Sequence, residues 1–230
     1  MSASPKHTSA HRPAADTQAT LHNLVEFLRE IDQLKSVERR SLIMDGSRRE
    51  NSAEHSWHVA LMALLLAPYA NEPIDVNRVI RMLLIHDLVE IDAGDTFAYD
   101  LVGRQNAAER EDAAARRLFG MLPTASQTEM LALWHEFEAR ATPEARFAKA
   151  MDRFLPVLHN YHTAGATWRE HGVSLEQVLD LNACIDEGAS DVWTYVQALL
   201  GNAQAAGYLH AAVDLPSPAR GTPRPDAASE

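Results

Sequence analysis

The feature that most constrains this chain is a histidine–aspartate pair, His86-Asp87, inside an otherwise apolar run over residues 79–90. The run predicts a helix that is buried on nearly every side. Burying an imidazole beside a carboxylate is costly unless both groups are paired or bind a metal ion. The fold must therefore supply this pair with polar partners or with a metal.

Two further residues of the same kind lie in apolar helical settings, His55 within residues 54–62 and Asp152 within residues 147–155. With the His-Asp pair they offer two nitrogen and two oxygen ligands, which suits one divalent transition metal with positions left for water. Mn²⁺, Fe²⁺, Co²⁺, Ni²⁺ and Zn²⁺ fit this ligand set alike, and Mg²⁺ fits it less well. The structural alternative pairs Asp152 with Lys149 or Arg153.

Composition narrows the class of protein. The 230 residues are 46% hydrophobic and 23% charged, which is ordinary for a globular domain. No run reaches the length of a membrane span, residues 1–7 lack a secretory signal, and the single cysteine, Cys184, excludes an intramolecular disulfide. We therefore expect a cytoplasmic protein away from membranes. The net charge of −11 disfavours a nucleic-acid polymer as partner.

Helical periodicity runs through the middle of the chain, and no stretch alternates as a strand. We predict a single all-α domain over residues 20–212, with disordered segments at 1–19 and 213–230. Helix starts are indicated at Asn51 with Glu54, Asp75, Thr124 with Gln127, Thr142-Pro143, and Ser174 with Gln177. The expected helices cover about 21–31, 51–66, 75–94 (holding His86), 104–119 and 124–138. A sixth starts at 142 and holds Asp152, and the last covers 174–200 with a break near Gly188.

The other histidines offer weaker signals. His58, three residues after His55, is read as a core or surface residue, with a supporting role behind the metal ligands as the alternative. His135 and His159 are read as structural or exposed. Gly-x-Ser-x-Gly, P-loop and Rossmann patterns are absent from the sequence, which disfavours serine hydrolases and dinucleotide or P-loop folds.

Four segments, 50–56, 86–90, 94–95 and 149–152, resemble the signatures of HD-domain metal-dependent phosphohydrolases, in that family's order and spacing. The resemblance covers roughly residues 20 to 200 and is strongest to the branch with bacterial 5′-deoxynucleotidases. It implies an HD-domain helical bundle. It also implies that one metal is held by His55, His86, Asp87 and Asp152.

The resemblance assigns catalytic roles as well. It implies that Glu90 is the acid/base beside the metal, that Asp87 takes part in catalysis as a ligand, that Asp95 holds the sugar and that Arg40 grips the phosphate. Arg39, Arg48 and Arg49 stay open as competitors for that last role. Ser41 stands where the 5′-deoxynucleotidases carry a Trp, which leaves the nucleoside preference undecided.

The function expected is hydrolysis of a (deoxy)nucleoside 5′-monophosphate by a metal-activated water. Alternatives are hydrolysis of nucleoside triphosphates or cyclic dinucleotides, or a metal-binding regulatory module without catalysis. Cyclic-dinucleotide enzymes need further histidines between the His-Asp pair and the last Asp, and only His135 lies there. A homodimer is expected because apolar residues occupy many helix faces.

Overall fold

The computed structural model describes residues 14–97, 99 and 105–210. The expected disordered segments at 1–13 and 213–230 lie outside these residues, whereas residues 14–19 belong to the first helix, which starts before the predicted boundary. The first half of the chain contains α1 (Ala14–Ile31), β1 (Glu38–Leu42), β2 (Arg49–Asn51), α2 (Ser52–Leu66), α3 (Val76–Ile85) and α4 (Glu90–Ala93). The second half contains α5 (Ala107–Phe119), α6 (Thr124–Ala139), α7 (Pro143–His162), α8 (Ala166–Glu170), α9 (Leu175–Asn182), α10 (Ile185–Gly188) and α11 (Ser190–Ala205).

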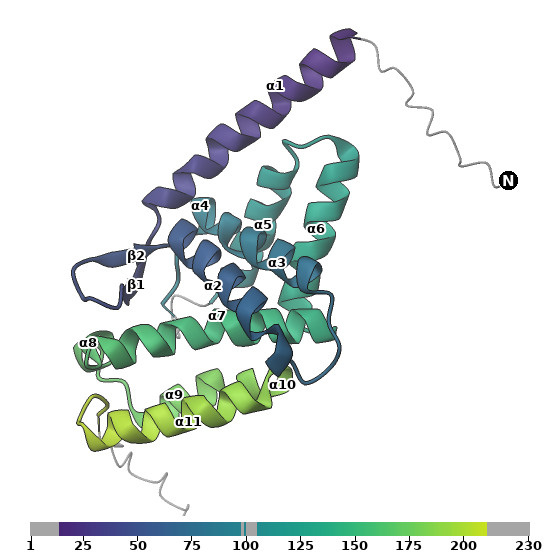
Figure 1. The fold of residues 1–230 in the computed structure, drawn as a ribbon. Coiled ribbons are helices and arrows are strands. Elements are labelled where there is room, and N and C mark those ends of the chain that lie inside the picture. Colours follow the sequence, from purple (N-terminus) through teal and green to yellow (C-terminus); the bar gives the residue numbers. More distant parts are fainter. Residues whose placement is uncertain (1–13, 98, 100–104, 211–230) are drawn as a thin grey trace, which may run out of the picture.

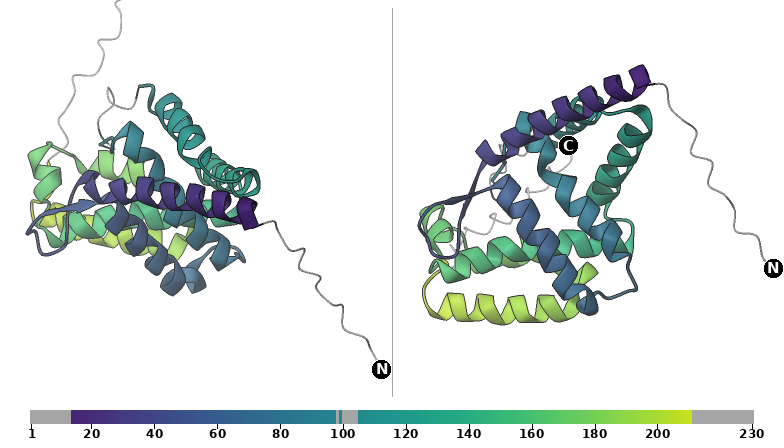
Figure 2. Two further views of the ribbon diagram at one scale, coloured as in Figure 1. Left: turned by 90° about the horizontal axis from the view of Figure 1, so that it is seen from above. Right: turned by 45° about the horizontal axis from the view of Figure 1, so that its top comes forward.

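Helix α7 is the centre of the bundle. It packs against α2, α3 and α6 on one side and against α10 and α11 on the other (Figure 1). Its buried residues include Phe147, Met151 and Leu155, all with no measurable exposure. Helix α1 forms an arm at the side of this body (Figure 2), and its Phe27 joins the core. The all-α prediction for the domain is confirmed.

Most helix starts follow the predicted chemistry. Capping boxes form at Asn51 with Glu54 and at Ser174 with Gln177, and Asp75 and Thr142 cap α3 and α7 through their side chains. The prediction for Thr124 was wrong: Pro123 is the N-cap of α6 and makes no side-chain cap, so Thr124 is already inside the helix. The expected start of the preceding helix, Arg104, lies outside the described residues, and α5 begins at Ala107.

The His-Asp pair does not lie in the continuous helix that the sequence predicts. Helix α3 ends at Ile85, and His86–Val89 form a 3₁₀ turn. Helix α4 ends at Ala93, where Gly94 follows as the C-cap with a φ of 74°. A 3₁₀ turn separates neighbouring side chains by about 120° rather than the 100° of an α-helix. The local backbone therefore turns Asp87 further from His86 than an α-helix would.

A two-stranded antiparallel hairpin is the second departure, since the sequence predicts no strand. Strand β1 pairs with β2 with Glu38 opposite Asn51 and Leu42 opposite Arg49, with an irregularity between these pairs. The hairpin is held by its surroundings: the Thr167 hydroxyl donates to the Arg40 carbonyl at 3.3 Å, and β1 contacts α7 and α8. Strands this short and polar carry no clear alternation, because tertiary contacts rather than their own pattern stabilise them.

Among the described residues, no helix is both long and apolar enough to cross a membrane. The expected break in the last predicted helix is also found, as α9, α10 and α11.

Candidate metal centre and substrate cavity

Three of the predicted metal ligands meet at one point between α2, the 3₁₀ turn and α7. His55 lies at the end of the first turn of α2, and its Nε2 is 3.1 Å from Asp152 Oδ1. His86 Nε2 is 3.6 Å from the same oxygen, and all three side chains are buried. Their potential ligand atoms lie within 4.8 Å of one another, so this inner cluster could hold a metal ion.

The His86 imidazole is oriented for this purpose. His86 Nδ1 lies 2.8 Å from the Leu83 carbonyl oxygen, which favours the tautomer with a proton on Nδ1 and a free electron pair on Nε2. His86 Nε2 is buried and makes no hydrogen bond of acceptable geometry among the described residues. A buried nitrogen acceptor that faces a carboxylate and a second imidazole is the arrangement that a divalent metal would complete.

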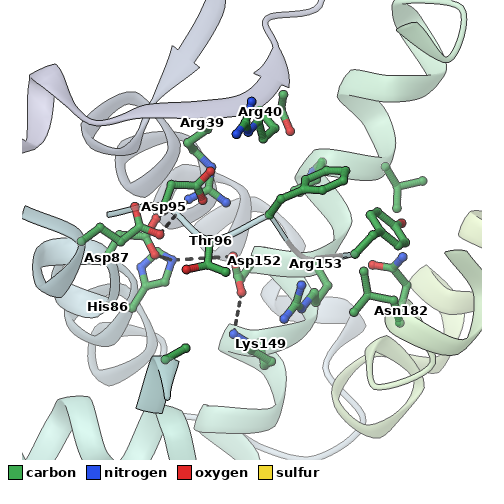
Figure 3. A pocket seen from close by; sticks show the side chains of 18 of the residues that line it. Arg39, Arg40, His86, Asp87, Asp95, Thr96, Lys149, Asp152, Arg153 and Asn182 are labelled. Atoms are coloured by element: carbon green, nitrogen blue, oxygen red, sulfur yellow. Dashed lines mark hydrogen bonds and ion pairs between the residues drawn. The ribbon is translucent and has the colours of Figure 1, made fainter. Parts of the chain in front are cut away.

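Asp152 is held from two sides. Its Oδ1 faces both imidazoles, and its Oδ2 is 2.8 Å from Lys149 Nζ. Burial alone would raise the pKa of Asp152, but Lys149, His55 and His86 together hold that pKa well below its usual range. The ion pair with Lys149 that the sequence offered as a structural alternative thus coexists with the inner cluster (Figure 3).

Asp87 lies beside this cluster rather than inside it. Its Oδ1 is 3.0 Å from His86 Nε2, while its Oδ2 accepts a hydrogen bond of 2.6 Å from Arg39 Nη1. The structure thus gathers His55, His86 and Asp152 and places the fourth predicted ligand next to them, shared with an arginine.

Arg39 is one of the three arginines that the sequence left open, besides Arg40, for binding the phosphate. Besides Asp87, its guanidinium lies 3.7 Å from both Glu90 Oε1 and Glu50 Oε2. Burial works against its charge, yet the carboxylates of Asp87 and Glu90 raise its pKa above the usual value, so it stays cationic. Only the hairpin, which turns Arg39 inward, could have revealed this role.

Glu90 begins α4 and faces the same space. Burial, reinforced by the Asp87 carboxylate and opposed by Arg39, raises the pKa of Glu90 to about 8. The Ser52 hydroxyl donates a hydrogen bond to it. A carboxyl group whose pKa lies near neutrality can both accept and release a proton, as general acid/base catalysis requires.

A cavity of about 370 Å³ opens from the inner cluster (Figure 3). Arg40 and Asp95, the two predicted substrate residues, both line it. Arg40 is exposed, and Asp95 is partly buried. Burial, partly opposed by Arg39, raises the pKa of Asp95. These two residues thus border the cavity on the hairpin side.

The other end of the cavity is formed by residues that the sequence did not single out. Tyr99, Trp168 and Asn182 line this end, and burial raises the pKa of Tyr99 to about 12. Arg153 also lines this end, and its Nε is buried without a hydrogen-bond partner among the described residues. The cavity therefore combines aromatic rings, an amide and a cation at the end away from His86.

Comparison with known proteins agrees with this geometry. The HD domain family model matches residues 31–193. The 5′-deoxynucleotidase HDDC2 of Bos taurus is 34% identical over 153 residues, which cover 66% of this chain and 70% of that protein. The Homo sapiens protein of the same name is 30% identical over 132 residues, which cover 57% of this chain and 63% of that protein.

A solved structure is similar throughout. The predicted metal-dependent phosphohydrolase from Magnetospirillum magnetotacticum is 50% identical, with a TM-score of 0.81 that covers 85% of this chain and 98% of that one. The matched family region contains every member of the inner cluster together with Arg39 and Glu90. The chain belongs to the HD-domain family.

Proposed function

We propose that this protein is a metal-dependent phosphohydrolase that cleaves the phosphomonoester of a (deoxy)nucleoside 5′-monophosphate. One observation carries the proposal: two buried imidazoles and Asp152 converge at the base of a cavity large enough for a nucleotide. The relatives named 5′-deoxynucleotidase support the choice of substrate class.

His55, His86 and Asp152, with Asp87 beside them, would hold one divalent ion. When bound, such an ion supplies a Lewis acid for a phosphoryl oxygen and lowers the pKa of water. The mixed nitrogen and oxygen donors favour Mn²⁺, Fe²⁺, Co²⁺, Ni²⁺ or Zn²⁺ over Mg²⁺. Lys149 keeps Asp152 ionised and fixes which of its oxygens faces the imidazoles.

Glu90 would take the proton from the attacking water and return it to the leaving 5′ oxygen. The balance of burial and Arg39 places its pKa where both steps are feasible. Arg39 faces Asp87 and Glu90 and would offset phosphate charge close to the metal. Arg40 would grip the phosphate from the hairpin, and Asp95 would bind the sugar.

The test is phosphate release from metal-stripped protein, reloaded in turn with Mn²⁺, Co²⁺, Ni²⁺, Zn²⁺ and Mg²⁺. We expect release from deoxynucleoside and ribonucleoside 5′-monophosphates, and little or none from triphosphates or cyclic dinucleotides. Hydrolysis of triphosphates alone would show that the substrates are nucleoside triphosphates and not monophosphates. Metal binding without turnover of any nucleotide would favour a regulatory module without catalysis.

We also propose a homodimer in the cytoplasm. Large apolar side chains are exposed on α1 and α2, among them Leu21, Leu28, Trp57, Leu64 and Leu65. Exposed apolar groups in this number often belong to protein interfaces. Light scattering on the purified full chain tests the dimer, and a monomer at micromolar concentration would refute it.

A further inference from the structure

We propose that Glu50, His58 and His159 form a second site for a divalent transition metal. This site lies on the side of the His55 imidazole that faces away from Asp152. Glu50 comes from β2, His58 from α2 and His159 from α7. Their potential ligand atoms lie within 4.8 Å of one another, a limit that the inner cluster also meets. This second cluster is distinct from the phosphohydrolase site and does not line its cavity.

The separations are near those of a real site. Bonds of 2.0–2.1 Å in a tetrahedral site place ligand atoms about 3.4 Å apart. Glu50 Oε2 and His159 Nδ1 are already 3.6 Å apart, and the rings of His58 and His159 have centroids 6.1 Å apart. A small rotation of His58, the most exposed of the three, would bring its nitrogen into range.

Two polar atoms in this cluster are buried and lack hydrogen bonds. Glu50 Oε2 and His159 Nδ1 have no partner of acceptable geometry, and their side chains are 2% and 3% exposed. Leaving such atoms unsatisfied is unfavourable, and each faces the other across a gap too long for a hydrogen bond. An ion between them would satisfy both.

Glu50 has other neighbours that must be considered. Its Oε2 also lies 3.4 Å from His55 Nδ1 and 3.7 Å from Arg39 Nε, and neither contact has hydrogen-bond geometry. Arg39 already donates to Asp87 at 2.6 Å, so Glu50 is not its main counter-ion. The His55 imidazole therefore lies between the two clusters, with Nε2 facing Asp152 and Nδ1 facing Glu50.

The donor set selects the metal. Two imidazoles and one carboxylate suit Zn²⁺, Co²⁺ or Ni²⁺, and they suit Mg²⁺ or Ca²⁺ poorly. The half-buried His58 gives an ion a path from solvent. We expect Zn²⁺ to bind there and to connect β2, α2 and α7.

The experiment counts metal ions per chain in the full-length protein after loading with Zn²⁺ and removal of excess. We expect two ions in the wild type and one in either His58→Gln or His159→Asn. His162→Gln is the matched control, since His162 is exposed on the same helix, and should keep two. His86→Gln should keep only the second ion.

A Co²⁺ titration followed by visible absorption gives an independent readout. The wild type should show two binding phases, and His58→Gln should weaken one of them by about 100-fold or more, beyond the usual effect of outer-shell changes. A single ion in the wild type, or two ions retained in both His58→Gln and His159→Asn, would overturn the proposal. Because no substrate is present, these counts do not depend on the proposed phosphatase activity.

Discussion

The inner end of the cavity and its hairpin side are built from different parts of the chain. Helical segments α2, the 3₁₀ turn and α7 supply the inner cluster, whose three residues are each less than a tenth exposed. The hairpin and the segment after Gly94 supply Arg40 and Asp95, which are more exposed. Packed helices hold a metal geometry precisely, whereas connecting segments are easier to alter. The comparison predicts that substitutions in the inner cluster affect metal binding, and that substitutions on the hairpin side affect substrate binding.

The largest effect should come from the inner end. His86→Ala and Asp152→Ala each remove a donor from the inner cluster, and we expect both to lose the catalytic ion and reduce phosphate release to background. Asp87→Ala should also lose that ion, because it removes one of the four predicted ligands and leaves Arg39 facing His86. Metal analysis of the purified variants checks this, and an inner site still filled in all three variants would contradict the assignment.

Glu90→Gln should have the next largest effect. The amide keeps the size of the side chain but cannot carry a proton, so turnover should fall by roughly 10² or more while the metal stays bound. The limb of the pH–rate profile that belongs to Glu90 should disappear as well. If the variant turns over normally at neutral pH, Glu90 has only a structural role through Ser52 and Arg39.

The two neighbouring arginines sharpen the comparison. Arg40→Ala should raise KM and lower kcat/KM by about one to two decades, the cost of a lost charge-assisted hydrogen bond, with every nucleotide accepted. Arg40→Lys should recover only part of this. Arg39→Ala should instead lower kcat, because Arg39 contacts Asp87 and Glu90. Steady-state kinetics on both variants measure these changes in KM and kcat. Unchanged kinetics in Arg40→Ala would indicate that Arg39, and not Arg40, binds the phosphate.

The smallest effect concerns a support far from the chemistry. Arg78 donates to both carboxylate oxygens of Glu136, and these hydrogen bonds hold the pKa of Glu136 below its usual value despite partial burial. A lowered carboxyl pKa stabilises the fold above the unfolded value of about 4.3, and this contribution is lost as the pH falls further.

Glu136→Gln should therefore lower the free energy of unfolding at pH 7 by about 1 kcal/mol, an estimate reduced for the 42% exposed Arg78. The loss should shrink toward pH 3. Urea unfolding at several pH values measures it, with Glu129→Gln as a control on the more exposed ion pair of the same helix. A large drop in kcat/KM of Glu136→Gln would mean that the geometry of the inner cluster depends on this distant contact between helices.

Much of this protein was predictable from local sequence. Asn51 with Glu54, Asp75, Thr142-Pro143 and Ser174 with Gln177 each encode a helix start within four residues, and the structure follows all of them. Three of the four predicted metal ligands also meet in the structure, because a histidine or carboxylate buried in an apolar helix needs a polar partner or a metal. The all-α class follows from the same periodicity.

Tertiary structure decided the rest. Arg39 and Arg40 are adjacent and chemically identical, and only the hairpin turns Arg39 into the site and leaves Arg40 exposed. The sequence could not place Glu50 against His159, which lies over a hundred positions away, or predict that His159 is buried. Helix signals act over a few residues and can be read along the chain. Which side chains meet depends on long-range packing, which no local pattern records.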